Sequence, residues 1–169
     1  MRRANDFYPT PLSIIDVLLQ HLNWDKETPI WEPCEGDGRL VTALCDKGYM
    51  VVGEDIATGD DFFAATKARS KHLITNPPFN QIRPFIDHAF NIGVQRMALV
   101  CPERLWACQK GSDQLQRHRP STFVNMSWRE DYLGKGGTPD RALAVSVWSS
   151  PNSETTVFDV WNKPQKECA

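Results

Sequence analysis

The sequence predicts an α/β fold built on a mostly parallel sheet with an antiparallel hairpin at one edge. Apolar runs typical of buried strands alternate with helical patterns, the strands at 29–32, 49–55, 71–75 and 96–101 and the helices at 11–22, 38–48 and 82–93. This alternation implies parallel strands joined by crossover helices. Two further strand-like runs, at 122–128 and 141–150, follow each other without a helix between them, which indicates an antiparallel pair.

Local signals support the individual elements. Residues 11–22 place leucine and isoleucine at helical spacing, and Pro11 suits the first turn of that helix. Gly48 can end the second helix. The glycine-rich stretch 134–140 indicates a flexible loop between the last two strands, and the polar tail 162–169 is expected to be disordered.

Composition limits the kinds of protein that this chain can be. Its 169 residues suit a single domain spanning 1–169, and the formal net charge of −2 excludes a broadly basic protein. No apolar run approaches the ~20 residues of a membrane helix. The five cysteines form no CxxC pair, which argues against a zinc site or a disulfide framework. We therefore expect no metal, no membrane association and a reducing, cytoplasmic location.

A glycine-rich turn follows the first strand. The stretch "EPCEGDG" occupies residues 32–38, where an open α/β sheet binds ligands at the start of a helix. Gly36 and Gly38 let the backbone come close to a ligand. The pattern is neither GxGxxG nor a P-loop, and a simple tight connection explains it equally well.

Acidic residues follow at two later positions. The second strand ends in Glu54 and Asp55, where a carboxylate commonly binds ribose hydroxyls. Asp61 can accept a hydrogen bond from the exocyclic amine of an adenine, and the Phe62 ring can pack on the base. A solvated strand end and a helix cap followed by core aromatics are the alternatives. The order of turn, ribose acid and adenine acid favours one nucleoside pocket.

The third strand ends in "TNPPFN", residues 75–80. Two consecutive prolines stop a strand because each lacks a backbone N–H and has a fixed φ. The segment is either a plain turn with a buried Phe79 or a rigid platform that presents Asn76 and Phe79 to a flat polar ligand.

Together these motifs resemble the S-adenosylmethionine-dependent amino-methyltransferases. The order "DFYPTP", "EPCEGDG", "GED", "GDDFF" and "NPPF" is most similar to DNA adenine-N6 methyltransferases with the cofactor motif before the catalytic motif. The match spans residues 6 to about 90, and a weaker one covers the last two strands. The resemblance implies a Rossmann-like class I methyltransferase sandwich, an enzyme that uses S-adenosyl-L-methionine, and double-stranded DNA as the partner.

The resemblance also implies roles for individual residues. The ribose would bind Asp55, with Glu54 as the alternative, and the adenine of the cofactor would bind Asp61 and Phe62. The methionine end would meet two groups of residues, namely Tyr8, Pro9 and Thr10, and Glu32, Cys34 and Gly36. The catalytic site would consist of Asn76, Pro77, Pro78 and Phe79.

The chemistry of an aromatic amine explains the last group independently. The lone pair of such an amine is delocalised into the ring, so the amine is a poor nucleophile. Asn76 and the carbonyl of Pro77 can accept its N–H groups and favour a tetrahedral nitrogen. The prolines fix these acceptors, and Phe79 offers a face for an extruded base.

The substrate stays open at the sequence level, because we expect no separate target-recognition domain. Residues 103–121 could form a small recognition insertion, with Arg104, Lys110, Arg117 and Arg119 contacting phosphates, or a solvated loop. A homodimer is another route to DNA recognition. RNA adenine and a protein glutamine amide are alternative substrates. A non-catalytic subunit that binds nucleic acid is a further alternative.

Overall fold

The computed structural model describes residues 9–131 and 141–164. Its helices are α1 (Leu12–His21), α2 (Arg39–Asp46), α3 (Ile82–Asn91) and α4 (Gln109–Arg117), with 3₁₀ turns η2 (Ile56–Thr58) and η3 (Phe62–Ala64). Its strands are β1 (Ile30–Glu32), β2 (Val51–Gly53), β3 (His72–Thr75), β4 (Arg96–Pro102), β5 (Thr122–Glu130), β6 (Arg141–Trp148) and β7 (Val157–Trp161). The predicted loop 134–140 lies outside the described residues.

Within the described residues, the strands form one sheet in the order β2-β1-β3-β4-β6-β5-β7. The β1–β2, β1–β3 and β3–β4 pairs are parallel, and β6 pairs antiparallel with both β4 and β5. The predicted antiparallel pair is therefore confirmed. It does not form the sheet edge, because β7 adds outside β5 in a parallel orientation. The sequence analysis did not predict β7.

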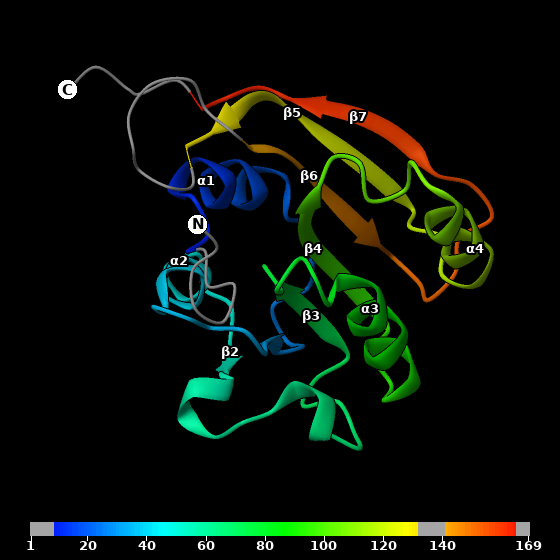
Figure 1. Cartoon of the computed structure of the whole chain (residues 1–169). Coiled ribbons are helices and arrows are strands. Elements are labelled where there is room, and N and C mark those ends of the chain that lie inside the picture. The colour runs from blue at the N-terminus through cyan, green and yellow to red at the C-terminus, as the bar shows by residue number, and fades with distance from the viewer. Residues whose placement is uncertain (1–8, 132–140, 165–169) are drawn as a thin grey trace.

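Two hydrophobic clusters hold the layers together, one on each face of the sheet. α1 and α2 cover one face and α3 covers the other (Figure 1). β4 contributes side chains to both clusters, because successive side chains of a strand point to opposite faces of the sheet. Ala98 and Val100 belong to the cluster that includes α1, and Met97, Leu99 and Cys101 belong to the cluster that includes α3. This layering is the predicted α/β sandwich.

The predicted helix boundaries match the structure closely. α1 begins directly after Pro11, which carries no N–H that a helix would leave unpaired. α2 ends at Asp46, and Gly48 then takes a left-handed φ of 84°, which glycine adopts without strain. β3 ends at Thr75, directly before Asn76 and the two prolines.

The segment 103–121 is a structured crossover between β4 and β5. It contains α4, which docks on α3 through the buried Gln114: its Nε2 donates to the carbonyl of Arg83 at 2.8 Å, and Arg83 Nη1 donates to Gln114 Oε1 at 3.2 Å. Gly111 permits a close approach of α4 to the preceding turn. A Cβ there would lie 2.7 Å from the carbonyl oxygen of Trp106 and 2.9 Å from that of Leu105.

We predict that Gly111→Ala destabilises the protein. Alanine normally favours an exposed helix over glycine by about 1 kcal/mol, but the clash with two backbone carbonyls should reverse the sign and cost about 1–3 kcal/mol. Chemical denaturation measures the change. The neighbouring exposed Ser112→Ala serves as the control and should leave the unfolding midpoint almost unchanged. A stabilised Gly111→Ala variant would contradict the close packing of α4.

Candidate active site

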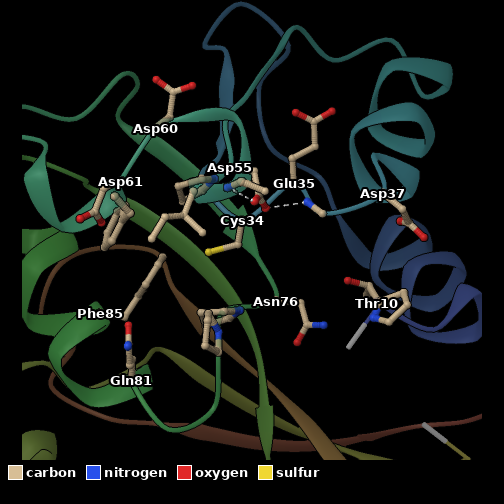
Figure 2. A pocket seen from close by; sticks show the side chains of 18 of the residues that line it. Thr10, Cys34, Glu35, Asp37, Asp55, Asp60, Asp61, Asn76, Gln81 and Phe85 are labelled. Carbon is tan, nitrogen blue, oxygen red and sulfur yellow. Dashed lines mark hydrogen bonds between the residues drawn. The ribbon is translucent and has the colours of Figure 1, made fainter. Parts of the chain in front are cut away.

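A cavity of about 240 Å³ opens at the carboxyl ends of β1, β2 and β3. Its walls come from four segments that are far apart in sequence, within the ranges 9–10, 33–39, 55–63 and 76–85. In the sheet, β2 lies on one side of β1 and β3 lies on the other. The cavity therefore lies at the point where the order of the strands reverses. Asn76 and Thr10 lie at one end, Asp61 and Phe85 at the other, and Cys34 and Asp55 between them (Figure 2).

The glycine turn is shaped by left-handed backbone at Gly36 and Gly38, with φ values of 61° and 76°. A side chain at either position would strain the turn. Gly36 N donates to Asp55 Oδ2 at 2.9 Å, which ties the turn to the residues after β2. Gly36 and Cys34, two of the predicted cofactor-binding residues, both line the cavity.

Asp55 and Glu54, the two candidates for a ribose acid, have different surroundings. Asp55 lines the cavity, and its Oδ1 accepts a hydrogen bond from Ala57 N at 2.8 Å. Glu54 is outside the cavity lining: its Oε2 accepts from Trp31 Nε1 at 3.0 Å and its Oε1 from Arg69 Nε at 2.7 Å. Glu54 therefore joins β1 to the segment before β3, and Asp55 is the carboxylate available to a ligand.

The predicted adenine end contains more aromatic surface than Phe62 alone. Phe62 is only 6% exposed and stacks on Phe85 with ring centroids 3.9 Å apart. Phe63 is 38% exposed, and all three rings line the cavity. Asp61 caps η3 by accepting from Phe63 N at 2.9 Å and also lines the cavity, so the cap and the ligand site are compatible. The sequence analysis missed Phe63, which adjoins Phe62, and Phe85, which looked like an ordinary core residue of a helix.

The four residues Asn76 to Phe79 all line the cavity. They follow β3 without regular secondary structure, and Pro78 O accepts from Gln81 N at 2.9 Å in the turn that leads into α3. Pro77 is buried, and Phe79 packs partly against the core cluster under α1. The segment is therefore a turn that lines the cavity, a geometry compatible with both alternatives.

The segment before α1 closes one wall. Pro9 and Thr10 line the cavity, while Tyr8 lies outside the described residues. Arg39, the first residue of α2, fastens this wall to the glycine turn: its Nη1 donates to Thr10 O at 3.2 Å, and its Nη2 pairs with Asp37 at 2.6 Å. The sequence analysis did not single out Arg39, because no motif distinguishes it from any other charged residue at the start of a helix.

Acidic side chains outnumber basic ones among the residues that line the cavity. The lining includes the carboxylates of Glu35, Asp37, Asp55, Asp60 and Asp61, and Arg39 is the one cationic side chain among the described lining residues. In Figure 2 the carboxylates of Glu35 and Asp60 point away from Cys34. Such a lining attracts a cationic ligand and repels phosphate groups, an effect that salt weakens for exposed charges.

Glu32 does not line the cavity, which differs from the prediction. It is 1% exposed at the end of β1, and its Oε1 accepts hydrogen bonds from Cys34 N at 3.0 Å and from Thr75 Oγ1. Burial raises the pKa of Glu32 to about 8. Its Oε2 is buried and has no hydrogen-bond partner among the described residues. The reason for the difference is strand alternation, which turns this side chain inward beneath the glycine turn.

Cys34 lines the cavity with a thiol that is not activated. Burial raises the pKa of this thiol, and the neighbouring Glu32 and Asp55 act in the same direction. Since the thiolate is the nucleophilic form, Cys34 contributes shape rather than covalent chemistry.

None of the four predicted phosphate-contacting residues lines the cavity. Arg117 Nη2 pairs with Asp87 of α3 at 3.3 Å, and Arg104 Nε lies 3.9 Å from Glu103. Lys110 is exposed on α4, and Arg119 is half-buried after it. These residues are therefore distributed along the crossover segment, and they do not form part of the cavity wall.

Comparison with solved structures identifies proteins with this fold. A protein from Listeria monocytogenes described as a class I S-adenosylmethionine-dependent methyltransferase matches with a TM-score of 0.62 and 12% identity, over 89% of this chain and 65% of its own. A type I restriction-modification methyltransferase subunit from Streptococcus thermophilus matches with a TM-score of 0.59 and 11% identity, over 90% and 47%. The 23S rRNA methyltransferase ErmE matches with a TM-score of 0.58 and 12% identity, over 88% and 72%.

These likenesses confirm the Rossmann-like methyltransferase fold that the sequence predicted. The chain spans only 65% and 47% of the Listeria and Streptococcus proteins. No protein-family model matches the sequence, and no curated protein matches it. Across the described ranges, no helix is long and apolar enough to cross a membrane, and no group of His, Cys, Asp or Glu is arranged to hold a metal ion.

The raised pKa of Glu32 predicts a pH dependence of stability. The unfolded carboxyl ionises near its usual 4.5 and the folded one near 8, so the unfolded state binds fewer protons between these values. The stability that Glu32 contributes is then full below pH 4.5 and is lost as pH rises towards 8. Glu32→Gln removes this titration, so its unfolding free energy relative to wild type should rise between pH 5 and 8.

Chemical denaturation at several pH values measures this difference. The exposed Glu154→Gln, far along the sequence before β7, is the control and should track wild type at each pH. A wild-type and Glu32→Gln difference that stays constant with pH would show that Glu32 is ionised in the folded protein.

Proposed function

We propose that this protein transfers the methyl group of S-adenosyl-L-methionine to the exocyclic N6 amine of adenine in DNA. The observation that carries the proposal is that Asn76 to Phe79 face the same cavity as the glycine turn, Asp55 and Asp61. A cofactor segment and an amine-binding segment on one cavity are what a direct transfer between two bound molecules requires.

The described residues suit this cofactor. When bound, S-adenosylmethionine supplies an electrophilic methyl group on a sulfonium ion. Asp55 would hold the ribose, and Asp61 with the ring of Phe63 would hold the adenine. Pro9, Thr10, Cys34 and Gly36 would surround the methionine end. The acidic residues of the lining favour a ligand that carries sulfonium and ammonium charges.

Asn76 and Pro77 would act on the acceptor amine. The side-chain oxygen of Asn76 and the carbonyl of Pro77 accept its two N–H groups and so localise the nitrogen lone pair. Pro77 and Pro78 hold both acceptors in one geometry, because their φ angles are fixed. Phe79 stacks on the base. The amine loses its surplus proton after transfer, so the reaction does not depend on a strong base.

DNA and RNA are the two candidate polymers. Restriction-modification subunits and a 23S rRNA methyltransferase share this fold, so DNA and RNA adenines are both candidate acceptors. We place DNA first because the motif order matches the DNA adenine-N6 enzymes. The basic residues of the segment 103–121 do not line the cavity, which favours an acceptor whose base is extruded from the backbone into it.

We predict that Asn76→Ala abolishes methyl transfer while S-adenosylmethionine still binds. Loss of one positioned acceptor should lower kcat by about 10²–10³-fold. The assay supplies labelled cofactor with unmethylated DNA, ribosomal RNA and total protein in separate reactions, then identifies the labelled product. Calorimetry measures cofactor affinity in the same preparations.

Asn80→Ala is the matched control, because Asn80 is an exposed amide in the same turn that does not line the cavity. Labelled N6-methyladenine in DNA supports the proposal. Label in RNA or in glutamine would show that RNA or protein is the substrate and would overturn the DNA assignment. Wild-type protein that binds no cofactor would instead favour a non-catalytic subunit.

A second prediction separates the two adjacent acids after β2. Asp55→Asn should weaken S-adenosylmethionine binding by about tenfold, since a hydrogen bond to a charged group contributes about 1.5–3 kcal/mol. Glu54→Gln should lower the unfolding midpoint, because it weakens the ties to Trp31 and Arg69, and should leave affinity within about twofold. Calorimetry and thermal unfolding of both variants provide the measurement, and reversed effects would assign the ribose to Glu54.

A further inference from the structure

β1 and β3 are adjacent parallel strands whose backbone pairing stops before their carboxyl ends. The register joins Ile30 to His72 and Trp31 to Leu73, and it includes neither Glu32 nor the last two residues of β3, Ile74 and Thr75. Beyond this point each strand follows its other neighbour: Glu32 pairs with Gly53 of β2, and Thr75 pairs with Leu99 of β4. The pairing between β1 and β3 therefore does not itself join the carboxyl end of β1, which leads into the glycine turn, to the carboxyl end of β3, which leads into the Asn76–Phe79 segment.

The side chain of Glu32 spans this gap. Its Oε1 accepts a hydrogen bond from Cys34 N, at the start of the glycine turn, and another from Thr75 Oγ1, directly before Asn76. Glu32 is 1% exposed and Thr75 is fully buried, so water does not compete for these bonds. One oxygen atom thus contacts both segments that form the proposed site.

We infer that Glu32 is a positioning residue that sets the distance between the cofactor-binding turn and the amine-binding segment. This inference rests on the proposed function and adds to it. Methyl transfer requires the donor carbon and the acceptor nitrogen at contact distance and in line, and a displacement of about 1 Å can cost about 100-fold in rate. The two walls belong to different strands, so a direct link between them controls that distance.

The test removes the hydrogen bond between Thr75 and Glu32 by a substitution in β3. Thr75→Val keeps the shape of the side chain and removes the hydroxyl donor to Glu32. We expect kcat to fall about 10–100-fold, while the affinity for S-adenosylmethionine stays within about twofold, because the cofactor walls remain. Hydrogen exchange should become faster in peptides covering 33–38, although the substituted residue lies in β3. Glu32→Gln keeps an acceptor oxygen and should retain most of the turnover, whereas Glu32→Ala should lose it.

Ser146→Ala is the matched control, since Ser146 is another fully buried strand hydroxyl and does not line the cavity. Equal effects of Thr75→Val and Ser146→Ala on kcat and on exchange at 33–38 would overturn the inference. So would a Glu32→Gln variant as impaired as Glu32→Ala. If wild type transfers no methyl group, the proposed function fails, but the exchange experiment still decides whether Glu32 links the two segments. Thr75→Val keeps the test available if Glu32→Ala does not fold.

Discussion

The arrangement of the site depends on one feature of the sheet, namely the separation of β1 and β3 at their carboxyl ends. β1 pairs with β2 on one side and with β3 on the other. The segment that follows β1 leads toward β2, whereas the segment that follows β3 leads away from β1, so these two segments run apart. The space between them becomes the cavity. Three of the lining segments, namely the glycine turn, the residues after β2 and the Asn76–Phe79 segment, follow directly after a strand, while Pro9 and Thr10 come from the segment before α1.

Both faces of the sheet contribute to holding this geometry. α1 and α2 pack on one face and α3 on the other, so β1 and β3 are buried along their whole length. The aromatic contact of Phe62 with Phe85 joins the loop after β2 to α3, across the cavity from the glycine turn. Arg39 makes a corresponding polar connection to Thr10. The cavity walls are therefore braced by both apolar and polar contacts.

The electrostatics of the site impose a constraint on any polyanionic substrate. The lining carboxylates attract a cationic cofactor, yet they repel a phosphate backbone at short range. A nucleic acid would have to present a neutral base to the cavity and keep its phosphates away from it, as base extrusion does. The basic residues of the crossover segment are partly engaged within the chain, as the Arg117–Asp87 pair illustrates. Among the described lining residues, only Arg39 could meet a phosphate group as a cation, and it is already paired with Asp37.

Local sequence determined the elements and the positions of the motifs. Pro11, Gly48 and the Pro77–Pro78 pair set boundaries through their own backbone restrictions, which act without tertiary contacts. Short apolar runs predicted the strands of the sheet core, and the positions of the motifs after these strands indicated Gly36, Asp55 and Asn76. Local signals failed for α4, a polar helix stabilised by the burial of Gln114 against Arg83, and for β7, a short strand fixed by pairing with β5. The sequence also did not distinguish the adjacent acids Glu54 and Asp55, of which only Asp55 lines the cavity. Nor did it show that the side chain of Glu32 lies outside the cavity wall. Only the tertiary structure decided these roles, because the direction of a side chain at a strand end depends on which neighbouring strand and which face surround it.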